Sequence, residues 1–158
     1  MMQLYINVGI PGSGKSTIAV PFANQMKLPI VSRDEIRFNF LKNDDNYFKY
    51  EKLVFNTFVS MIVKNLKETG GCLADATHIN FASRNKLISA IAQEINVSEF
   101  TIHYICFDIP LETCIARNEQ RTGWAYVPPA TIETMYKSLE FPTIDEFSNV
   151  ESILRIKE

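Results

Sequence analysis

Eight residues near the N-terminus have the spacing of a phosphate-binding loop. The run Gly9-Ile10-Pro11-Gly12-Ser13-Gly14-Lys15-Ser16 fits the pattern G-x-x-x-x-G-K-[ST] in full. Glycines there let backbone N–H groups turn inward around a triphosphate, and a following helix adds positive potential at its N-terminus. We expect Lys15 to reach the β- and γ-phosphates and the Ser16 hydroxyl to bind Mg²⁺, which prefers oxygen ligands. The expected nucleotide-binding residues of this loop are Gly9, Pro11, Gly12, Ser13, Gly14, Lys15, Ser16 and Thr17.

The chain lacks two features that usually accompany nucleotide hydrolysis. The only Asn-Lys pair, Asn85-Lys86, is followed by Leu87-Ile88 and so does not form the N-K-x-D reader of guanine. Asp75, at the end of an apolar run, is followed by Ala76 and not by a glutamate that could polarise water. These observations favour transfer of the γ-phosphate of ATP to a bound acceptor over its hydrolysis.

A charged run follows the short apolar stretch over residues 29–31. It reads Ser32-Arg33-Asp34-Glu35-Ile36-Arg37 and lies at the carboxyl edge of a sheet if that stretch is a strand. Asp34 could accept the proton of a hydroxyl whose oxygen attacks phosphorus. Arg37, three residues on, could hold an acceptor phosphate through its forked guanidinium. The alternative is that Asp34 only complements the dipole at a helix N-terminus.

The run Asp75-Ala76-Thr77-His78-Ile79-Asn80 ends a third apolar strand. Asp75 could accept a hydrogen bond from Ser16 or from a metal-bound water, and Thr77 could bind an acceptor. The alternative is a turn that ends the strand and leads to a helix capped by Asn80. The residues alone leave the roles of Thr77 and His78 open.

Two arginines four residues apart, Arg117 and Arg121, lie at the end of another expected helix. Residues at this spacing share one helix face, so both guanidinium groups could point together. An arginine supplied by the same chain can stabilise charge on the γ-phosphate oxygens, and Gly123 could serve as a hinge. We therefore expect a lid over about residues 117–129, in which Trp124 could stack on a base or anchor the loop. The alternative is that the arginines complement the helix dipole.

Alternating strands and helices must hold these candidates together. Strands are expected over residues 3–8, 29–31, 72–74, 99–107 and 150–156. Helices are expected over residues 15–25, 32–42, 47–68, 80–95 and 130–140, with a further one from Pro110 through both arginines. This order predicts an α/β fold with a parallel sheet covered on both faces. Such folds bind ligands beyond the carboxyl ends of their strands.

Composition sets outer limits on the protein class. The chain has 158 residues, 46% hydrophobic and 22% charged, which suits a single globular domain over residues 1–158. The net charge of −2 excludes a strongly basic nucleic-acid coat but leaves room for a local basic site. No run approaches the ~18 apolar residues of a membrane span, and no signal-peptide pattern opens the chain. We therefore expect no membrane partner and a cytoplasmic location.

The three cysteines, Cys72, Cys106 and Cys114, form no C-x-x-C pair. Two lie in apolar, strand-like runs, where a free thiol behaves as a small hydrophobe, and a reducing compartment follows from this usage. His78 and His103 sit in unrelated segments, so a zinc site is not expected.

Taken together, the motifs resemble the polynucleotide 5′-hydroxyl kinase family of P-loop phosphotransferases, above all the phage kinase domains. The resemblance spans about residues 3–141. After the phosphate loop it rests on Arg33-Asp34-Glu35-Ile36-Arg37, Asp75-Ala76-Thr77-His78-Ile79-Asn80, Phe107-Asp108-Ile109-Pro110, Arg117-Asn118, Arg121-Thr122-Gly123 and Met135-Tyr136-Lys137-Ser138. The family often has an aspartate immediately before the threonine, whereas this chain has Ala76 there and Asp75 one place earlier.

The resemblance implies the P-loop kinase fold: a parallel sheet of about five strands in the order 2-3-1-4-5, flanked by helices, with an arginine-bearing lid. It implies Asp34 as general base, with Lys15 and Arg121 acting on the γ-phosphate. It also implies Arg37 and Thr77 for the acceptor and Ser16 for Mg²⁺. From the residues themselves we add Arg33 to the acceptor site, Asp75 to the Mg²⁺ site, and Arg117 with Arg121 to the nucleotide site.

Three functions remain open at this point. The first is transfer of the ATP γ-phosphate to the 5′-OH of DNA or RNA. The second is a kinase of a nucleoside, a hydroxymethylated DNA base or another small hydroxyl acceptor, which the mildly acidic charge favours because tracking of extended phosphates usually needs a basic surface. The third is a nucleotide-gated switch without transfer chemistry. The oligomeric state does not follow from the sequence.

Overall fold

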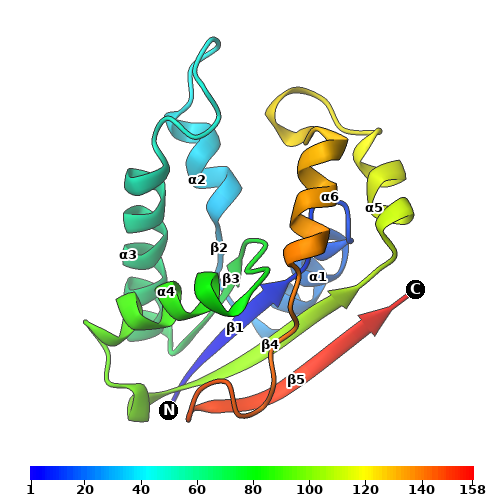
Figure 1. Cartoon of the computed structure of the whole chain (residues 1–158). Helices are drawn as coiled ribbons and strands as arrows, with labels where there is room; N and C mark the ends of the chain where they lie inside the picture. The colour runs from blue at the N-terminus through cyan, green and yellow to red at the C-terminus, as the bar shows by residue number, and fades with distance from the viewer.

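A five-stranded parallel sheet forms the centre of the chain, as seen in a computed structural model that describes residues 1–158 (Figure 1). Its strands are β1 (Met2–Val8), β2 (Ile30–Ser32), β3 (Gly71–Asp75), β4 (Phe100–Asp108) and β5 (Val150–Lys157). They lie in the order β2-β3-β1-β4-β5, and every neighbouring pair is parallel. The expected fold and strand order are therefore confirmed.

Six α-helices connect and cover the strands. They are α1 (Lys15–Met26), α2 (Arg33–Phe40), α3 (Glu51–Thr69), α4 (Phe81–Ala92), α5 (Leu111–Asn118) and α6 (Pro129–Ser138). Two short 3₁₀ helices span Val97–Glu99 and Gly123–Ala125. In Figure 1, α2 and α3 stand on one side above the sheet and α5 and α6 on the other.

The core has two layers because both faces of the sheet are covered. On one face, side chains of α3 and α4 pack against β1, β3 and β4. On the other face, side chains of α1, α5 and α6 pack against the sheet. The central strands are correspondingly mainly apolar, as expected for parallel strands buried on both sides.

Two helix boundaries near the site differ from the sequence prediction. The third long helix begins at Glu51 and not at residue 47, because Asp45 and Asn46 bond to nearby backbone N–H groups and form turns instead. The helix α5 ends at Asn118, so Arg121 lies beyond it. The expectation that Arg117 and Arg121 share one helix face is therefore wrong.

The side chain of Asn118 gives the physical reason for the end of α5. Its Nδ2 donates to the carbonyl of Val127 at 2.6 Å, and its Oδ1 accepts from the Val127 N–H at 3.0 Å. This buried pairing closes residues 119–126 into a loop that leaves the helix axis.

None of the helices is long and apolar enough to cross a membrane.

Candidate functional site

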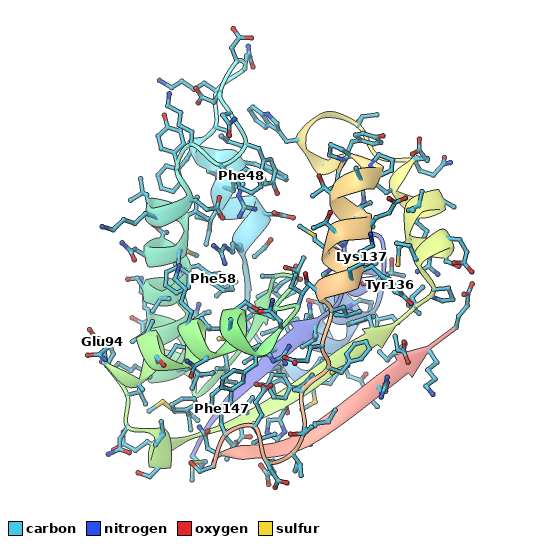
Figure 2. All side chains as sticks on the ribbon, in the orientation of Figure 1. Phe48, Phe58, Glu94, Tyr136, Lys137 and Phe147 are labelled. Atoms are coloured by element: carbon cyan, nitrogen blue, oxygen red, sulfur yellow. The ribbon has the colours of Figure 1, made fainter.

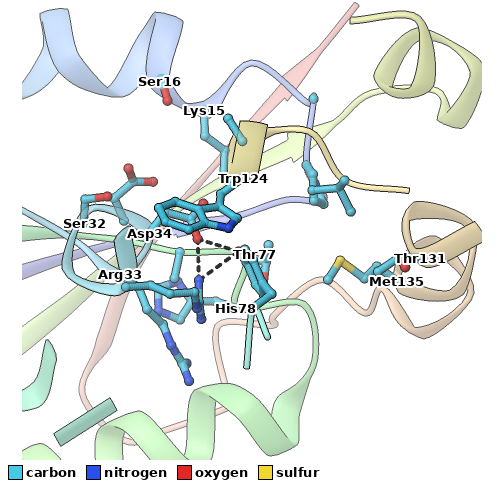
Figure 3. A pocket seen from close by; sticks show the side chains of 18 of the residues that line it. Lys15, Ser16, Ser32, Arg33, Asp34, Thr77, His78, Trp124, Thr131 and Met135 are labelled. Atoms are coloured by element: carbon cyan, nitrogen blue, oxygen red, sulfur yellow. Dashed lines mark hydrogen bonds and ion pairs between the residues drawn. The ribbon is translucent and has the colours of Figure 1, made fainter. Parts of the chain in front are cut away.

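A cavity of about 590 Å³ gathers most of the expected site residues. The phosphate loop, the start of α2, the end of β3 and the segment after α5 all contribute to its wall (Figure 3). The expected residues that line it are Pro11, Gly12, Gly14, Lys15, Ser16, Thr17, Arg33, Asp34, Arg37, Asp75, Thr77 and Arg121. Gly9, Ser13 and Arg117 do not line it.

The phosphate loop depends on glycine at two positions where the backbone is left-handed. Gly12 has φ +84°, and a Cβ there would lie 2.3 Å from the carbonyl oxygen of Cys114 in α5. Gly14 has φ +94° and forms the N-cap of α1. The loop therefore lies directly against α5, and a larger residue at position 12 would push the two apart.

Of the three expected residues outside the cavity, Gly9 and Ser13 belong to the loop and Arg117 contacts it from α5. The Gly9 N–H donates to the carbonyl of Thr77 at 3.0 Å, which ties the loop to the end of β3. Ser13 is buried, and its N–H donates to the carbonyl of Ile10. Arg117 Nη1 donates to the Gly12 carbonyl at 3.4 Å. These contacts shape the loop, and direct contact of these residues with a nucleotide remains a prediction.

The amine of Lys15 is hydrogen-bonded to backbone carbonyls of the phosphate loop. Its Nζ donates to the carbonyls of Gly9 and Ile10, both at 2.9 Å. Burial lowers the pKa of Lys15 to about 8, although the charges of Asp75 and Asp34 act in the opposite direction. To reach a phosphate, the amine must exchange these carbonyls for phosphate oxygens, which are stronger partners for a cation.

Asp34 lies in the first turn of α2 with 62% of its side chain exposed. Arg37 Nη1 donates to Asp34 Oδ1, as the spacing of three residues allows. The Tyr47 hydroxyl also donates to Asp34 Oδ1, at 3.0 Å. The carboxylate therefore faces the cavity with its orientation set by two donors, while its exposed surface remains available to a hydroxyl group.

Two residues of this cluster, Glu51 and Tyr47, were missed by the sequence analysis. Glu51 pairs with the Nε and Nη2 of Arg37, and it accepts from Arg33 Nη2 at 3.1 Å. Tyr47 lies against the Arg37 guanidinium, with 4.7 Å between the guanidinium carbon and the ring centroid. Neither contact has a local spacing signal, because both join α2 to segments 10–18 residues away.

The pKa of Glu51 reports the strength of this pairing. Burial raises the pKa of the carboxyl group, but the hydrogen bonds and charges of Arg37 and Arg33 outweigh it, so the net shift is downward. Glu51 is therefore ionised and neutralises part of the positive charge beside Asp34.

Asp75 ends β3 and faces the same cavity as Ser16. Its Oδ1 accepts from Asn7 Nδ2 at 2.9 Å, whereas no hydrogen bond joins it to Ser16. Burial raises the pKa of Asp75, although the Asn7 hydrogen bond and the Lys15 charge lower it. A hydroxyl and a carboxylate in one cavity are the oxygen donors that Mg²⁺ accepts, so these residues fit that ion.

The opposite wall comes from the loop after α5 and from α6. Trp124 lines the cavity and stacks on Phe38 of α2, with ring centroids 6.1 Å apart. Met135 of α6 also lines it, whereas its neighbours Tyr136 and Lys137 are exposed and do not. Figure 2 places Tyr136 and Lys137 on α6, across the site from Phe48 and Phe58.

Comparison with known proteins gives one family match and many structural matches. The sequence matches the family described as AAA domain (AAA_33) over residues 4–142. A chain in the structure of the Pnkp1/Rnl/Hen1 RNA repair complex is 27% identical, with a TM-score of 0.73. That match covers 94% of this chain and 47% of the other, so the relative is about twice as long.

Two more distant structures share the fold. An unliganded sugar kinase from Janibacter sp. HTCC2649 is 15% identical with a TM-score of 0.68, covering 99% of this chain and 86% of that one. A fungal RNA kinase is 12% identical with a TM-score of 0.67, covering 99% and 74%. Kinases with different acceptors therefore share this arrangement of sheet and helices.

Proposed function

Because the chain belongs to the AAA domain family AAA_33, a P-loop kinase domain, we propose that it transfers the γ-phosphate of ATP to the 5′-hydroxyl of a polynucleotide. The observation that carries the proposal is the shared cavity, which Asp34 lines from α2, Lys15 from the phosphate loop and Arg121 from the segment after α5. A nucleophile and a triphosphate bound there would meet between these groups.

The proposed reaction uses each of these side chains once. Asp34 takes the proton of the acceptor hydroxyl as its oxygen forms a bond to the γ-phosphorus. The bond from that phosphorus to the β-phosphate oxygen breaks, and ADP leaves. Lys15, Arg121 and the N–H groups of the loop balance the charge on the transferred phosphoryl group. Mg²⁺, held through Ser16 and Asp75, would supply further charge neutralisation on the nucleotide.

Arg121 reaches the cavity from the loop between α5 and α6, which we propose is a lid over about residues 117–129. Asn118 and Val127 hold the two ends of this loop together through paired hydrogen bonds. Gly123, with a left-handed backbone at φ +62° and open space around it, would serve as the hinge of this loop. The lid would bend at this glycine while its two ends stay held together.

A polynucleotide acceptor is supported by two features. Arg37 is held in place beside Asp34, where its guanidinium could bind the phosphate that follows a 5′-terminal nucleoside. The 27% identical relative belongs to an RNA repair complex, which is the chemical setting of such an acceptor.

A small neutral acceptor is the second candidate, and Glu51 favours it. Arg33 and Arg37 face two carboxylates, Asp34 and Glu51, so the four formal charges cancel. A site for a phosphate would ordinarily keep an excess of positive charge, whereas a nucleoside or a sugar needs none.

Transfer of label from γ-labelled ATP to a 5′-hydroxyl oligonucleotide tests the first candidate. Asp34→Asn keeps the side-chain shape, and it should lower turnover by about 10²- to 10⁴-fold while the Kd for ATP stays nearly unchanged. Asp145→Asn is the matched control, because Asp145 is exposed and lies away from the cavity, and it should retain activity. Full transfer by the Asp34 variant would contradict the assigned base.

The dependence of acceptor affinity on salt concentration tests which class of acceptor the protein uses. A polynucleotide should bind more weakly as salt rises, with a steep slope of log K against log[salt], because bound phosphates release counterions. A nucleoside or a sugar should show almost no slope. Label transfer to nucleosides or sugars alone, with none to oligonucleotides, would establish the second candidate.

A further inference from the structure

Tyr47 joins the proposed general base to a segment outside its own helix. It lies between α2 and α3 and lines the cavity together with Asp34 and Arg37. Its hydroxyl donates to Asp34 Oδ1 at 3.0 Å, because an ionised carboxylate can only accept. The hydroxyl oxygen accepts from Arg37 Nη1 at 3.0 Å, and the same Nη1 also donates to Asp34 Oδ1. These hydrogen bonds form the dashed triangle beside Asp34 in Figure 3.

The triangle makes the two carboxylate oxygens of Asp34 different from each other. A carboxylate oxygen has about two lone-pair positions, and Oδ1 uses its positions for Tyr47 and Arg37. Oδ2 makes no hydrogen bond to another protein atom, and 62% of the side chain is exposed. Oδ2 is therefore the oxygen that is free to take the proton of an acceptor hydroxyl.

Arg37 by itself holds Asp34 only from the same helix. An exposed carboxylate keeps its rotational freedom unless partners in more than one direction hold it. Tyr47 supplies a partner from outside the helix, and its own ring is packed. The ring centroid lies 6.5 Å from that of Phe38, 4.9 Å from that of Phe48 and 4.7 Å from the guanidinium carbon of Arg37. A packed side chain that donates to Oδ1 limits the rotation of the carboxylate.

A tyrosine at this place could instead be the base itself, and its surroundings oppose that role. Burial and the negative charge of Asp34 raise the pKa of Tyr47 to about 12, although the charge of Arg37 acts in the opposite direction. The phenol therefore keeps its proton near neutral pH and remains a donor to Asp34.

We propose that Tyr47 is a positioning residue, which holds Asp34 through Oδ1 so that Oδ2 takes the proton of the acceptor hydroxyl. This inference rests on the proposed function. In the step, the O–H bond of the acceptor breaks and its proton moves to Oδ2, while the oxygen forms a bond to the γ-phosphorus. The bond from that phosphorus to the bridging oxygen breaks, and ADP leaves with its electron pair. Tyr47 keeps its own proton and fixes the orientation of the base.

Tyr47→Phe tests the role of the hydroxyl, because it keeps the ring that packs on Arg37 and the two phenylalanines. With γ-labelled ATP and a 5′-hydroxyl oligonucleotide, this variant should lower kcat about 10-fold. The loss is smaller than for Asp34→Asn, since the base is present but less well oriented. The KM for the oligonucleotide and the Kd for ATP should stay within about twofold of wild type. Tyr50→Phe, the same change in the same segment but outside the cavity, should keep the wild-type kcat.

The double variant Asp34→Asn/Tyr47→Phe separates positioning from direct binding of the acceptor. If the hydroxyl acts only through the carboxylate, its removal causes no further loss once residue 34 is asparagine. A hydroxyl that contacts the acceptor itself would lower activity by the same factor in both backgrounds and would raise the KM for the oligonucleotide. Either of those two results overturns the proposal.

The remaining outcomes separate the inference from the function on which it rests. An unchanged kcat in Tyr47→Phe, with Asp34→Asn strongly impaired, overturns the positioning role and leaves the kinase assignment standing. Full activity in Asp34→Asn overturns the assigned base, and the positioning role with it. Wild-type protein that binds ATP but labels no oligonucleotide overturns the polynucleotide acceptor and this inference together, and that result needs no variant.

Discussion

Replacement of Gly12 by alanine tests how the phosphate loop is seated against α5. The added Cβ would lie 2.3 Å from the Cys114 carbonyl oxygen, 3.0 Å from its carbonyl carbon and 3.1 Å from its Cα. All three atoms belong to helix backbone, so no side-chain rotation relieves the contact. Either the loop or α5 must move until the shortest contact exceeds about 3 Å.

Gly70→Ala is a matched control for this change. Gly70 has φ +81°, close to the +84° of Gly12, but a Cβ there would have no atom within 4 Å. The cost of a left-handed alanine, about 1–2 kcal/mol, is therefore common to both variants. The entropy that alanine removes from the unfolded chain is also common to both, so the two terms cancel in the comparison.

The remaining difference is the backbone clash, which we place at about 1–3 kcal/mol from the cost of overpacking a rigid interior. Urea unfolding of the two variants measures it directly as a lower free energy of unfolding for Gly12→Ala. The same variant should bind ATP more weakly, because the N–H groups of the loop move relative to Arg117 and the rest of the cavity. Equal loss of stability in the two variants would refute the argument that contact with α5 requires glycine at position 12.

Further predictions concern three buried polar groups. Arg84→Met should lower the free energy of unfolding, measured in urea, by about 3–5 kcal/mol, because it leaves the carboxylate of Glu146 buried without its cation. Adding Glu146→Gln should restore part of the lost stability. If the double variant regains nothing, the loss does not come from an unpaired Glu146 carboxylate. Asn118→Ala should lower the free energy of unfolding by about 2 kcal/mol, since the backbone N–H and carbonyl of Val127 both lose their hydrogen-bond partner. It should also lower kcat more than it lowers the affinity for ATP. An unchanged kcat would count against a lid whose ends are held by Asn118 and Val127. Below pH 6.5 the unfolded chain protonates His78 while the folded chain, with a pKa of about 3, does not, so wild-type stability falls with decreasing pH. The stability of His78→Phe relative to wild type should therefore rise by up to about 1.4 kcal/mol per pH unit between pH 6.5 and 4, and a constant difference would show that the folded histidine is protonated.

Short-range features of the site were predictable from the sequence. The phosphate loop follows from glycine and lysine positions within eight residues, and the Asp34–Arg37 pair follows from one turn of helix. The parallel sheet follows from apolar strands that alternate with helices, and the strand order from the resemblance. The loop and the helical pair depend on residues close together in the chain, where backbone geometry limits the outcome.

Long-range features were not predictable in the same way. Nothing in the local pattern indicates that Glu51 holds Arg37 and Arg33, because a charged residue at the start of a helix ordinarily faces water. The position of Arg121 was mispredicted, because the helix ends where Asn118 finds a partner nine residues further on. The proton position on His78 depends on a carbonyl 71 residues away.

The sequence by itself thus determined the chemical groups of the site and the strand ends that carry them. Only the tertiary structure decided which of those groups are paired and which are neutral. The physical reason is that hydrogen bonding, burial and local charge depend on neighbours in space, and these neighbours come together only when the sheet and its helices pack.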